Sequence, residues 1–299
     1  MMPNVTTPLL IIGAALPRTA TTSLVAALEQ LGYRVWHATT WSPAMTPIWN
    51  DISRAEEEGD TEKYRESFDG FVQQLSLEGF NATLDQPSCF VYQELLQYYP
   101  NAKVLKTERS ASSWAHSMVE MAFSIDLMVY QPPYNRSWNK VEGPFGYWMK
   151  KKLGFKDEEI FPKGVPFNGT NDRLETKSSV SLASCEAAYN RHQQKVEQTV
   201  PPDQLVAYSA KEGWEPLCQH FLPPNYTCPS SIHQPFPHVN SRHGGFLLDF
   251  RRRASTTVQL YKIHPWLSRQ EWLVKSIIII MKKRRGVLNF LQSSLQQRR

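Results

Sequence analysis

A short loop between an apolar segment and a helix-like segment is the strongest candidate for chemistry in this 299-residue chain. It reads Leu-Pro-Arg-Thr-Ala-Thr-Thr-Ser from Leu16 to Ser23, and so joins one cation to several hydroxyls. Backbone N–H groups at the start of a helix, together with the helix dipole, favour a bound anion. We therefore predict an anion-binding loop made of Arg18, Thr19, Ala20, Thr21, Thr22 and Ser23. The alternative is an ordinary strand-to-helix turn capped by a threonine.

Two common nucleotide-binding loops do not fit this segment. A nucleoside-triphosphate loop of the GxxxxGK[ST] type would need a lysine where Thr21 stands. Residues 13–15 read Gly-Ala-Ala and do not supply the GxGxxG of a dinucleotide site. The sequence therefore disfavours hydride transfer and leaves a nucleotide or phosphate kinase as a lesser alternative.

Polar side chains follow four further apolar segments at the points where those segments end. These residues are His37, Asp85, Arg109 and Lys211. In open α/β sheets ligands bind outside the carboxyl ends of the strands. We therefore expect these four residues to approach the loop from separate parts of the chain.

The elements that would position these residues alternate between strand-like and helix-like segments over the first 220 residues. This alternation is typical of a parallel sheet flanked by helices. Strands are expected at 9–15, 33–36, 81–84, 103–107 and 205–208, and helices at 22–31, 61–77, 89–99, 111–123, 179–200 and 212–221. We expect a loop between His37 and Thr61. The predicted fold class is α/β, with three layers, a parallel sheet of about five strands and a P-loop NTPase-like arrangement.

Three regions organise the chain. Residues 1–240 are expected to form the α/β domain, and residues 124–176, rich in Pro, Gly and aromatic residues, an insertion over the active face. Trp138, Tyr147 and Trp148 in this insertion would either line an acceptor pocket or form core under a long loop. Residues 241–299 form a basic tail with an amphipathic helical character.

The sequence resembles the PAPS-dependent sulfotransferases, in the branch whose loop reads like LPRTGTTSL. In that superfamily a second element pairs an arginine at a strand end with a serine eight residues later. The segment VLKTERSASSWAHSM provides this pair as Arg109 and Ser117. The resemblance continues in YNRHQQKVEQTVPPDQL, KEGWEPLC and FPHVN, and covers most of residues 8–240.

The resemblance implies a sulfotransferase that uses PAPS (3′-phosphoadenosine 5′-phosphosulfate) as donor and needs no metal. Arg18, Thr21 and Thr22 would hold the 5′-phosphosulfate and the departing phosphate. Arg109 would grip the 3′-phosphate with two guanidinium nitrogens, Ser117 would add a hydroxyl, and Lys211 is a further cofactor-binding candidate. The acceptor would be a hydroxyl or amine of a small molecule that the sequence does not identify.

Such an acceptor must lose a proton, which requires a base within hydrogen-bond reach. Asp85, in the segment LDQP, is the first candidate, because burial would raise the pKa of its carboxyl. His37 is the second, since imidazole titrates near neutral pH. The alternative for Asp85 is a cap on the following helix through the N–H groups of Ser88 or Cys89. His192 and His238 are interpreted as structural.

One loop residue departs from the resembled pattern, because Ala20 stands where that branch has glycine. If the position needs a positive φ, alanine costs about 1 kcal/mol there and could weaken cofactor binding. A degenerate, non-catalytic and membrane-associated member of the fold is therefore the alternative to an active enzyme.

The formal charge of +5 is unevenly distributed along the chain. Residues 240–299 carry 13 basic and 2 acidic side chains, so the remainder of the chain is net acidic. We therefore expect no nucleic-acid partner, since such binding needs cations clustered on one face of a folded domain. The tail 251–299 would either lie on an anionic membrane surface or pack on the body by its apolar stripe.

Features of the sequence that bear on cellular location point in different directions. We expect no signal peptide, no membrane span and no structural metal, and we expect buried free thiols, with a Cys218–Cys228 bridge only in an oxidising compartment. Five N-x-S/T sequons, however, begin at Asn4, Asn81, Asn135, Asn168 and Asn225. The prediction is a cytoplasmic protein, peripherally attached to membranes if the tail binds them, with the Golgi lumen as the minority alternative; the oligomeric state is not indicated.

Overall fold

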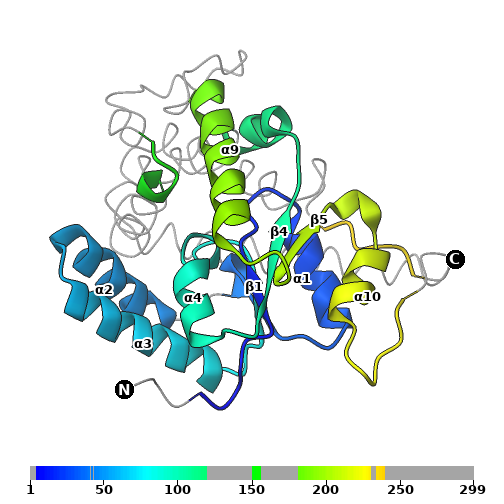
Figure 1. Cartoon of the computed structure of the whole chain (residues 1–299), viewed down its shortest axis with the longest axis horizontal. Helices are drawn as coiled ribbons and strands as arrows, with labels where there is room; N and C mark the ends of the chain where they lie inside the picture. The colour runs from blue at the N-terminus through cyan, green and yellow to red at the C-terminus, as the bar shows by residue number, and fades with distance from the viewer. Residues whose placement is uncertain are drawn as a thin grey trace, which may run out of the picture.

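Five short parallel strands form the central sheet, in the order β2-β3-β1-β4-β5 (Figure 1). The computed structural model describes residues 5–40, 42, 44–119, 150–155, 181–229 and 234–239. The strands are β1 (Ile11–Gly13), β2 (Val35–Trp36), β3 (Ala82–Thr83), β4 (Lys103–Thr107) and β5 (Leu205–Tyr208). The predicted parallel α/β architecture is thereby confirmed.

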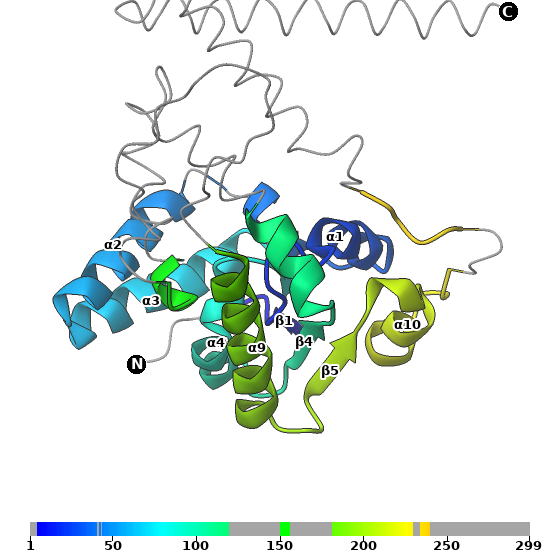
Figure 2. The same ribbon diagram turned by 90° about the horizontal axis from the view of Figure 1, so that it is seen from above.

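Helices cover both faces of this sheet, as the second view shows (Figure 2). They are α1 (Thr21–Gln30), α2 (Met45–Glu58), α3 (Thr61–Leu77), α4 (Tyr92–Tyr98), α9 (Leu182–Thr199) and α10 (Glu215–Phe221). Short 3₁₀ turns lie at η1 (Ala38–Thr40), η2 (Ser88–Phe90) and η3 (Ala210–Glu212), and residues 111–119 are also helical. The helices α1 and α10 lie on one face, and α3, α4 and α9 lie on the other.

Two hydrophobic clusters, one on each face of the sheet, hold the three layers together. Ile12 and Trp36 belong to the cluster that packs under α3, α4 and α9, whereas Ile11 and Val35 belong to the cluster under α1 and α10. Neighbouring residues of one strand point to opposite faces, and both faces of this sheet are covered. This is why β1 reads as an uninterrupted apolar run.

The register of the sheet brings the ends of β1 and β3 into close contact. Gly13, the last residue of β1, donates its N–H to the Thr83 hydroxyl at 3.2 Å. A Cβ at Gly13 would collide with the backbone oxygen of Thr83 and would lie 2.7 Å from Cα of Leu84. Because Gly13 has no side chain, the end of β1 can lie against Thr83 and Leu84 at the end of β3. The loop that follows β1 therefore begins close to Asp85.

The segment expected to be a loop between His37 and Thr61 instead contains the helix α2. Met45, Trp49 and Ile52 are buried at helical spacing, and Trp49 packs edge-on against Phe71 of α3. Pro47 lies in the first turn, where a proline is tolerated because its missing N–H has no partner in the helix. The prediction of a loop was wrong, because these apolar side chains at helical spacing form the buried face of a helix.

A disulfide joins Cys218 of α10 to Cys228, with their Cα atoms 5.7 Å apart. The expectation of free thiols is therefore wrong for these two cysteines, and the structure has the bridge that was the alternative. Cys89 and Cys185 are free and buried, as expected. The bridge ties α10 to the chain that follows it.

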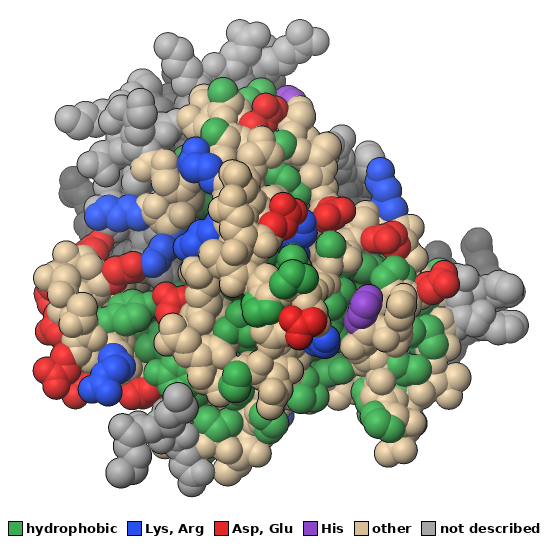
Figure 3. Space-filling view, viewed as in Figure 1, with side chains coloured by type: hydrophobic (Ala, Val, Ile, Leu, Met, Phe, Trp, Pro, Cys, Tyr) green, Lys and Arg blue, Asp and Glu red, His purple; other side chains and the backbone are tan. Residues whose placement is uncertain are grey.

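Acidic side chains gather over the end of the α2–α3 hairpin on the face shown in Figure 3. Exposed members of this group are Glu56, Glu57, Glu58, Asp60 and Glu62. Lys and Arg are scattered over the same face. This distribution agrees with the net acidic charge of the body.

Several predictions concern residues outside the described ranges. These are the insertion 124–176 except for 150–155, its aromatic residues Trp138, Tyr147 and Trp148, and the tail 241–299. Among the residues that the structure describes, no helix is both long enough and apolar enough to cross a membrane.

Candidate active site

The loop after β1 adopts a left-handed backbone at two non-glycine residues. Arg18 has φ 70° and Ala20 has φ 67°. Ala20 is the residue that precedes α1, and it provides no side-chain cap. The loop is therefore not the threonine-capped turn of the alternative interpretation, and the position of Ala20 requires the conformation for which glycine is best suited.

The carbonyl oxygens of this loop and of Ala14 just before it are held by donors from three parts of the protein: α9, the segment after β4 and the loop itself. They are Ala14 O with His192 Nε2 at 2.8 Å, Leu16 O with the Thr19 hydroxyl at 2.6 Å, Pro17 O with Trp114 Nε1 at 2.8 Å, and Arg18 O with an Arg109 guanidinium nitrogen at 2.6 Å. The first N–H groups of α1 have no partner within the helix, because its first backbone bond runs from Leu24 N to Ala20 O. Carbonyl oxygens held by the protein, next to the start of a helix, are what an anion site needs.

The donor on Ala14 is a neutral imidazole. Burial lowers the pKa of His192 to about 4, which outweighs the opposite effect of its bond to Ala14 O. A carbonyl only accepts, so Nε2 carries the proton of the neutral ring. His192 therefore has a definite structural task at the start of the loop.

The two predicted anion-binding elements meet at Arg18. Its Nε donates to the Ser117 hydroxyl at 2.9 Å, while its carbonyl accepts from Arg109. The other nitrogens of Arg109 donate to Ser113 Oγ at 3.0 and 2.8 Å, and its backbone N–H donates to the Tyr189 hydroxyl at 2.9 Å. The structure therefore brings together the three residues Arg18, Arg109 and Ser117, which the family resemblance assigns to the 5′ and 3′ anionic groups of one nucleotide.

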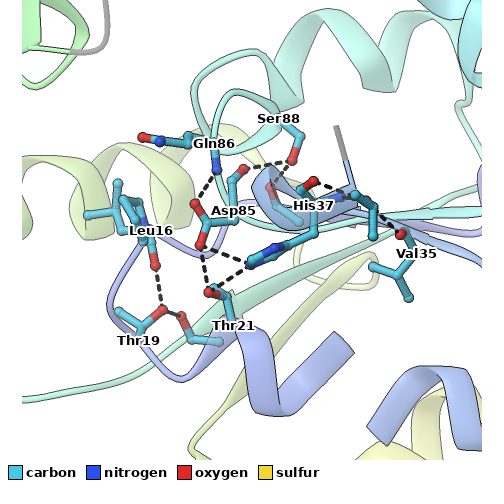
Figure 4. A network of polar contacts seen from close by, with 12 residues as sticks. Leu16, Thr19, Thr21, Val35, His37, Asp85, Gln86 and Ser88 are labelled. Carbon is cyan, nitrogen blue, oxygen red and sulfur yellow. Dashed lines mark hydrogen bonds and ion pairs between the residues drawn. The ribbon is translucent and has the colours of Figure 1, made fainter. Parts of the chain in front are cut away.

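The third group of predicted residues forms a compact polar cluster (Figure 4). The Thr21 hydroxyl donates to Asp85 Oδ2 at 2.6 Å. His37 Nε2 lies 3.2 Å from the same carboxylate oxygen and 3.2 Å from Thr21 Oγ1. All three side chains are buried. The base candidates therefore contact the anion loop directly.

The expectation that the pKa of Asp85 is raised is wrong. Burial does raise it, but the hydrogen bond and charge of His37 act in the opposite direction. The Thr21 hydroxyl and the Gln86 N–H, 2.6 Å from Oδ1, lower it further. The net effect holds the pKa of Asp85 below its usual value, so the carboxylate is a stable anion and a partner for His37.

Asp85 also differs from the helix-cap interpretation. Its backbone oxygen, and not its side chain, accepts the Cys89 N–H at 2.9 Å and the Ser88 hydroxyl at 2.8 Å. The residue has φ 68°, so the described chain has three non-glycine residues with positive φ, and all of them lie in this site. Unusual backbone conformations concentrate at functional sites.

Two predicted cofactor residues are placed differently from the rest. The Ser23 hydroxyl donates to Val239 O at 3.2 Å and accepts the Val239 N–H at 3.0 Å, so it holds a neighbouring segment. Lys211 lies in η3 with an exposed side chain that forms no hydrogen bond or ion pair with described residues. Thr22 is half-buried in the first turn of α1.

Sequence reasoning missed several residues that hold the loop. Thr107 donates its hydroxyl to Thr19, Trp114 holds Pro17, and Tyr189 holds Arg109. Trp114 and Tyr189 lie in segments that were matched to the family, but their partners are 80 or more residues away. The sequence signal for Tyr189 is its spacing from His192, because the two residues lie about one turn apart on α9 and so share one face of the helix.

No group of three or more His, Cys, Asp or Glu side chains in the described ranges is arranged to hold a metal ion. A parallel sheet whose first strand leads through a loop into a helix places this protein among the open-sheet α/β proteins, in which ligands bind at the carboxyl ends of the strands. The sequence matches the family described as "Sulfotransferase domain" over residues 10–244. The chain therefore belongs to the sulfotransferase family.

One similar protein is the "Ava biosynthesis cluster protein M" of Aspergillus versicolor. The two sequences are 29% identical over 234 residues, which span 76% of this chain and 79% of the relative. The alignment therefore covers more than three quarters of each protein.

Proposed function

We propose that this sulfotransferase moves a sulfuryl group from PAPS to a hydroxyl or amine of a small molecule. The observation that carries the proposal is the meeting of two anion-binding elements at Arg18, which contacts both Arg109 and Ser117. A donor with anionic groups at its 5′ and 3′ ends needs two such elements side by side.

The residues fit this donor. The start of α1, with Arg18, Thr21 and Thr22, would take the 5′-phosphosulfate, and Thr19 and Ala20 would shape the loop. Arg109 and Ser117 would take the 3′-phosphate. The held carbonyl oxygens matter here, because an oxygen turned toward an anion would repel it.

The chemistry that PAPS supplies is a sulfuryl group on a phosphate leaving group. The acceptor oxygen or nitrogen forms a bond to sulfur, and the bond between sulfur and the phosphate oxygen breaks with its electron pair on that oxygen. Arg18 and the N–H groups of α1 stabilise the charge that develops there. The acceptor proton passes to the Asp85–His37 pair, whose side chains lie 3.2 Å apart.

The acceptor class is proposed from the relative's name, which connects that protein to a biosynthesis cluster. An acceptor that is itself a biosynthetic small molecule agrees with this. A transfer screen with ³⁵S-labelled PAPS over alcohols, phenols, amines and sugars would identify it. Transfer to none of them, together with no micromolar binding of PAP, the desulfated product, would contradict the proposal.

Binding specificity gives a sharper test that needs no acceptor. PAP carries a 3′-phosphate and adenosine 5′-monophosphate does not, so calorimetry should find PAP bound at least 10-fold more tightly by the wild type. Equal affinity for both nucleotides would remove the role of Arg109 and Ser117. Binding of ATP with Mg²⁺ in preference to PAP would favour the kinase alternative.

The basic tail is proposed to attach the protein to anionic membranes, because 13 of the chain's basic residues follow Val239. Each cation close to such a surface adds about 1 kcal/mol of attraction. Sedimentation with phosphatidylserine vesicles should retain the full chain and lose a variant that ends after Arg253. Equal retention of both would show that the tail is not the attachment site.

A further inference from the structure

Thr21 stands between two tasks that a single hydroxyl cannot perform together. It is the first residue of α1, where the anion loop meets the helix, and its hydroxyl donates to Asp85 Oδ2 at 2.6 Å. A threonine hydroxyl has one proton to donate. A donor anion at the helix start and the Asp85 carboxylate therefore compete for the same proton.

The geometry around this hydroxyl links it to the base candidates. His37 Nε2 is at 3.2 Å from both Thr21 Oγ1 and Asp85 Oδ2, so the three polar groups form a closed triangle (Figure 4). All three side chains are at least nine-tenths buried. Any loss of the Thr21 bond must then be compensated by His37 or by a ligand, because buried polar groups without partners are costly.

We propose that Thr21 couples donor binding to the readiness of the base: its hydroxyl bonds Asp85 in the empty site and turns to the donor's 5′ anion when the donor binds. Asp85 then keeps only His37 and the Gln86 N–H as partners. This inference rests on the proposed function, since it needs an anionic donor at the start of α1.

The consequence follows from the charges that face Asp85. His37 comes from the end of β2, Gln86 N–H from Asp85's own segment, and Cys89 from η2. Burial and the charge of Asp85 raise the pKa of Cys89, so this thiol stays neutral and adds no charge of its own. Removing the Thr21 bond withdraws a donor that lowers the pKa of Asp85, so the Asp85 carboxylate gains affinity for the acceptor's proton.

Such coupling would make the base effective only after the donor has bound. Without the donor, the Asp85 carboxylate is held by its hydrogen bonds and is a weak base. With the donor in place, the base strengthens at the moment when its proton acceptance is useful. Thr21 is thus a positioning residue that acts through Asp85.

A crystal structure of the wild type with PAP tests the switch directly. The expected result is a Thr21 Oγ1 within hydrogen-bond distance of the 5′-phosphate and more than 3.5 Å from Asp85 Oδ2. Retention of the 2.6 Å bond to Asp85 with PAP bound would overturn the inference. Failure of PAP to bind at all would instead contradict the proposed function.

A variant pair supplies a second readout that a purely structural role would not change. Thr21→Val keeps the shape and removes the hydroxyl, whereas Thr21→Ser keeps the hydroxyl. In the unliganded Thr21→Val protein, ¹³C NMR of labelled aspartate should find the pKa of Asp85 higher than in the wild type by about 1. Thr21→Ser should match the wild type, and Asp85→Asn identifies the signal. An unchanged pKa in Thr21→Val would overturn the inference even if that variant fails to bind PAP.

Discussion

Arg109 donates a hydrogen bond to the backbone oxygen of Arg18, so the side chain proposed for the 3′-phosphate also fixes the loop proposed for the 5′ end. The bond is 2.6 Å long and spans 91 residues of sequence. The residues proposed for the two ends of the donor are therefore joined by a direct hydrogen bond.

Arg109→Ala should weaken PAP binding by at least 100-fold, because the change removes two charge-assisted contacts to a phosphate and releases Arg18 O. Arg109→Lys should recover only part of the loss, since an ammonium cannot form the two-pronged contact. Calorimetry checks both values. Arg54→Ala, at an exposed ion pair on α2, is the matched control and should leave the affinity unchanged.

Ala20→Gly should raise the free energy of unfolding by about 1 kcal/mol, because glycine adopts φ 67° without the steric cost of a Cβ. Ala26→Gly, in the middle of α1, should lower it by a similar amount. Urea unfolding measures both. PAP affinity and turnover should stay the same or improve in Ala20→Gly. A large gain in turnover, from a wild type without measurable transfer, would identify the natural chain as the non-catalytic member.

The Asp85–His37 pair should be essential for turnover and dispensable for PAP binding. Asp85→Asn and His37→Gln are each expected to lower turnover by about 100-fold or more, since a positioned base contributes that much. Steady-state kinetics and PAP calorimetry separate the two effects, and Asp51→Asn on the surface of α2 is the control. Unchanged turnover in Asp85→Asn would assign the proton transfer to His37 alone.

His192 should make stability depend on pH. The pKa of this imidazole is about 4 in the folded chain and near 6.5 when unfolded, so between these values only the unfolded state binds the proton. Its contribution to stability is present above pH 6.5 and decreases as the pH falls toward 4. Urea unfolding should therefore find that His192 accounts for a loss of about 2 kcal/mol between pH 7 and pH 5. His192→Gln should lack this part of the decrease, and an identical pH dependence in both proteins would contradict the assignment.

The disulfide gives a test of cellular address. Denatured protein that has not been reduced should contain two titratable thiols, Cys89 and Cys185, if the Cys218–Cys228 bridge forms in its natural compartment. Four thiols in protein taken from its natural source would favour the cytoplasmic prediction, because disulfides are rare in the cytosol. Replacing both bridge cysteines by serine should cost about 2 to 3 kcal/mol of stability in the oxidised protein.

The regular part of the fold was predictable from local pattern. The strands Lys103–Thr107 and Leu205–Tyr208 have the expected bounds, and the helix Thr61–Leu77 does as well. Apolar runs and helical spacing are local properties, so the sequence carries them without knowledge of the tertiary contacts. The strands β1, β2 and β3 are shorter than predicted, because an apolar run shows burial and does not show where the strand ladder ends.

The sequence predicted which residues form the site but did not predict which bonds they make. Motif spacing indicated Arg18, Arg109 and Ser117, but it did not show that Thr21 donates to Asp85 or that His192 holds Ala14. Those bonds join residues 64 and 178 positions apart. The direction of the Asp85 pKa depends on which donors surround the carboxylate, and sequence alone gives its burial without its partners.

The paired bonds between Ser23 and Val239 set the point from which the rest of the chain departs. Since Ser23 lies in the first turn of α1, these two bonds fasten the segment 234–239 to the helix that begins at the anion loop. The two residues are 216 positions apart, so the last described segment returns to the start of the fold. A substitution at Ser23 therefore disturbs the start of α1 and the distant segment together.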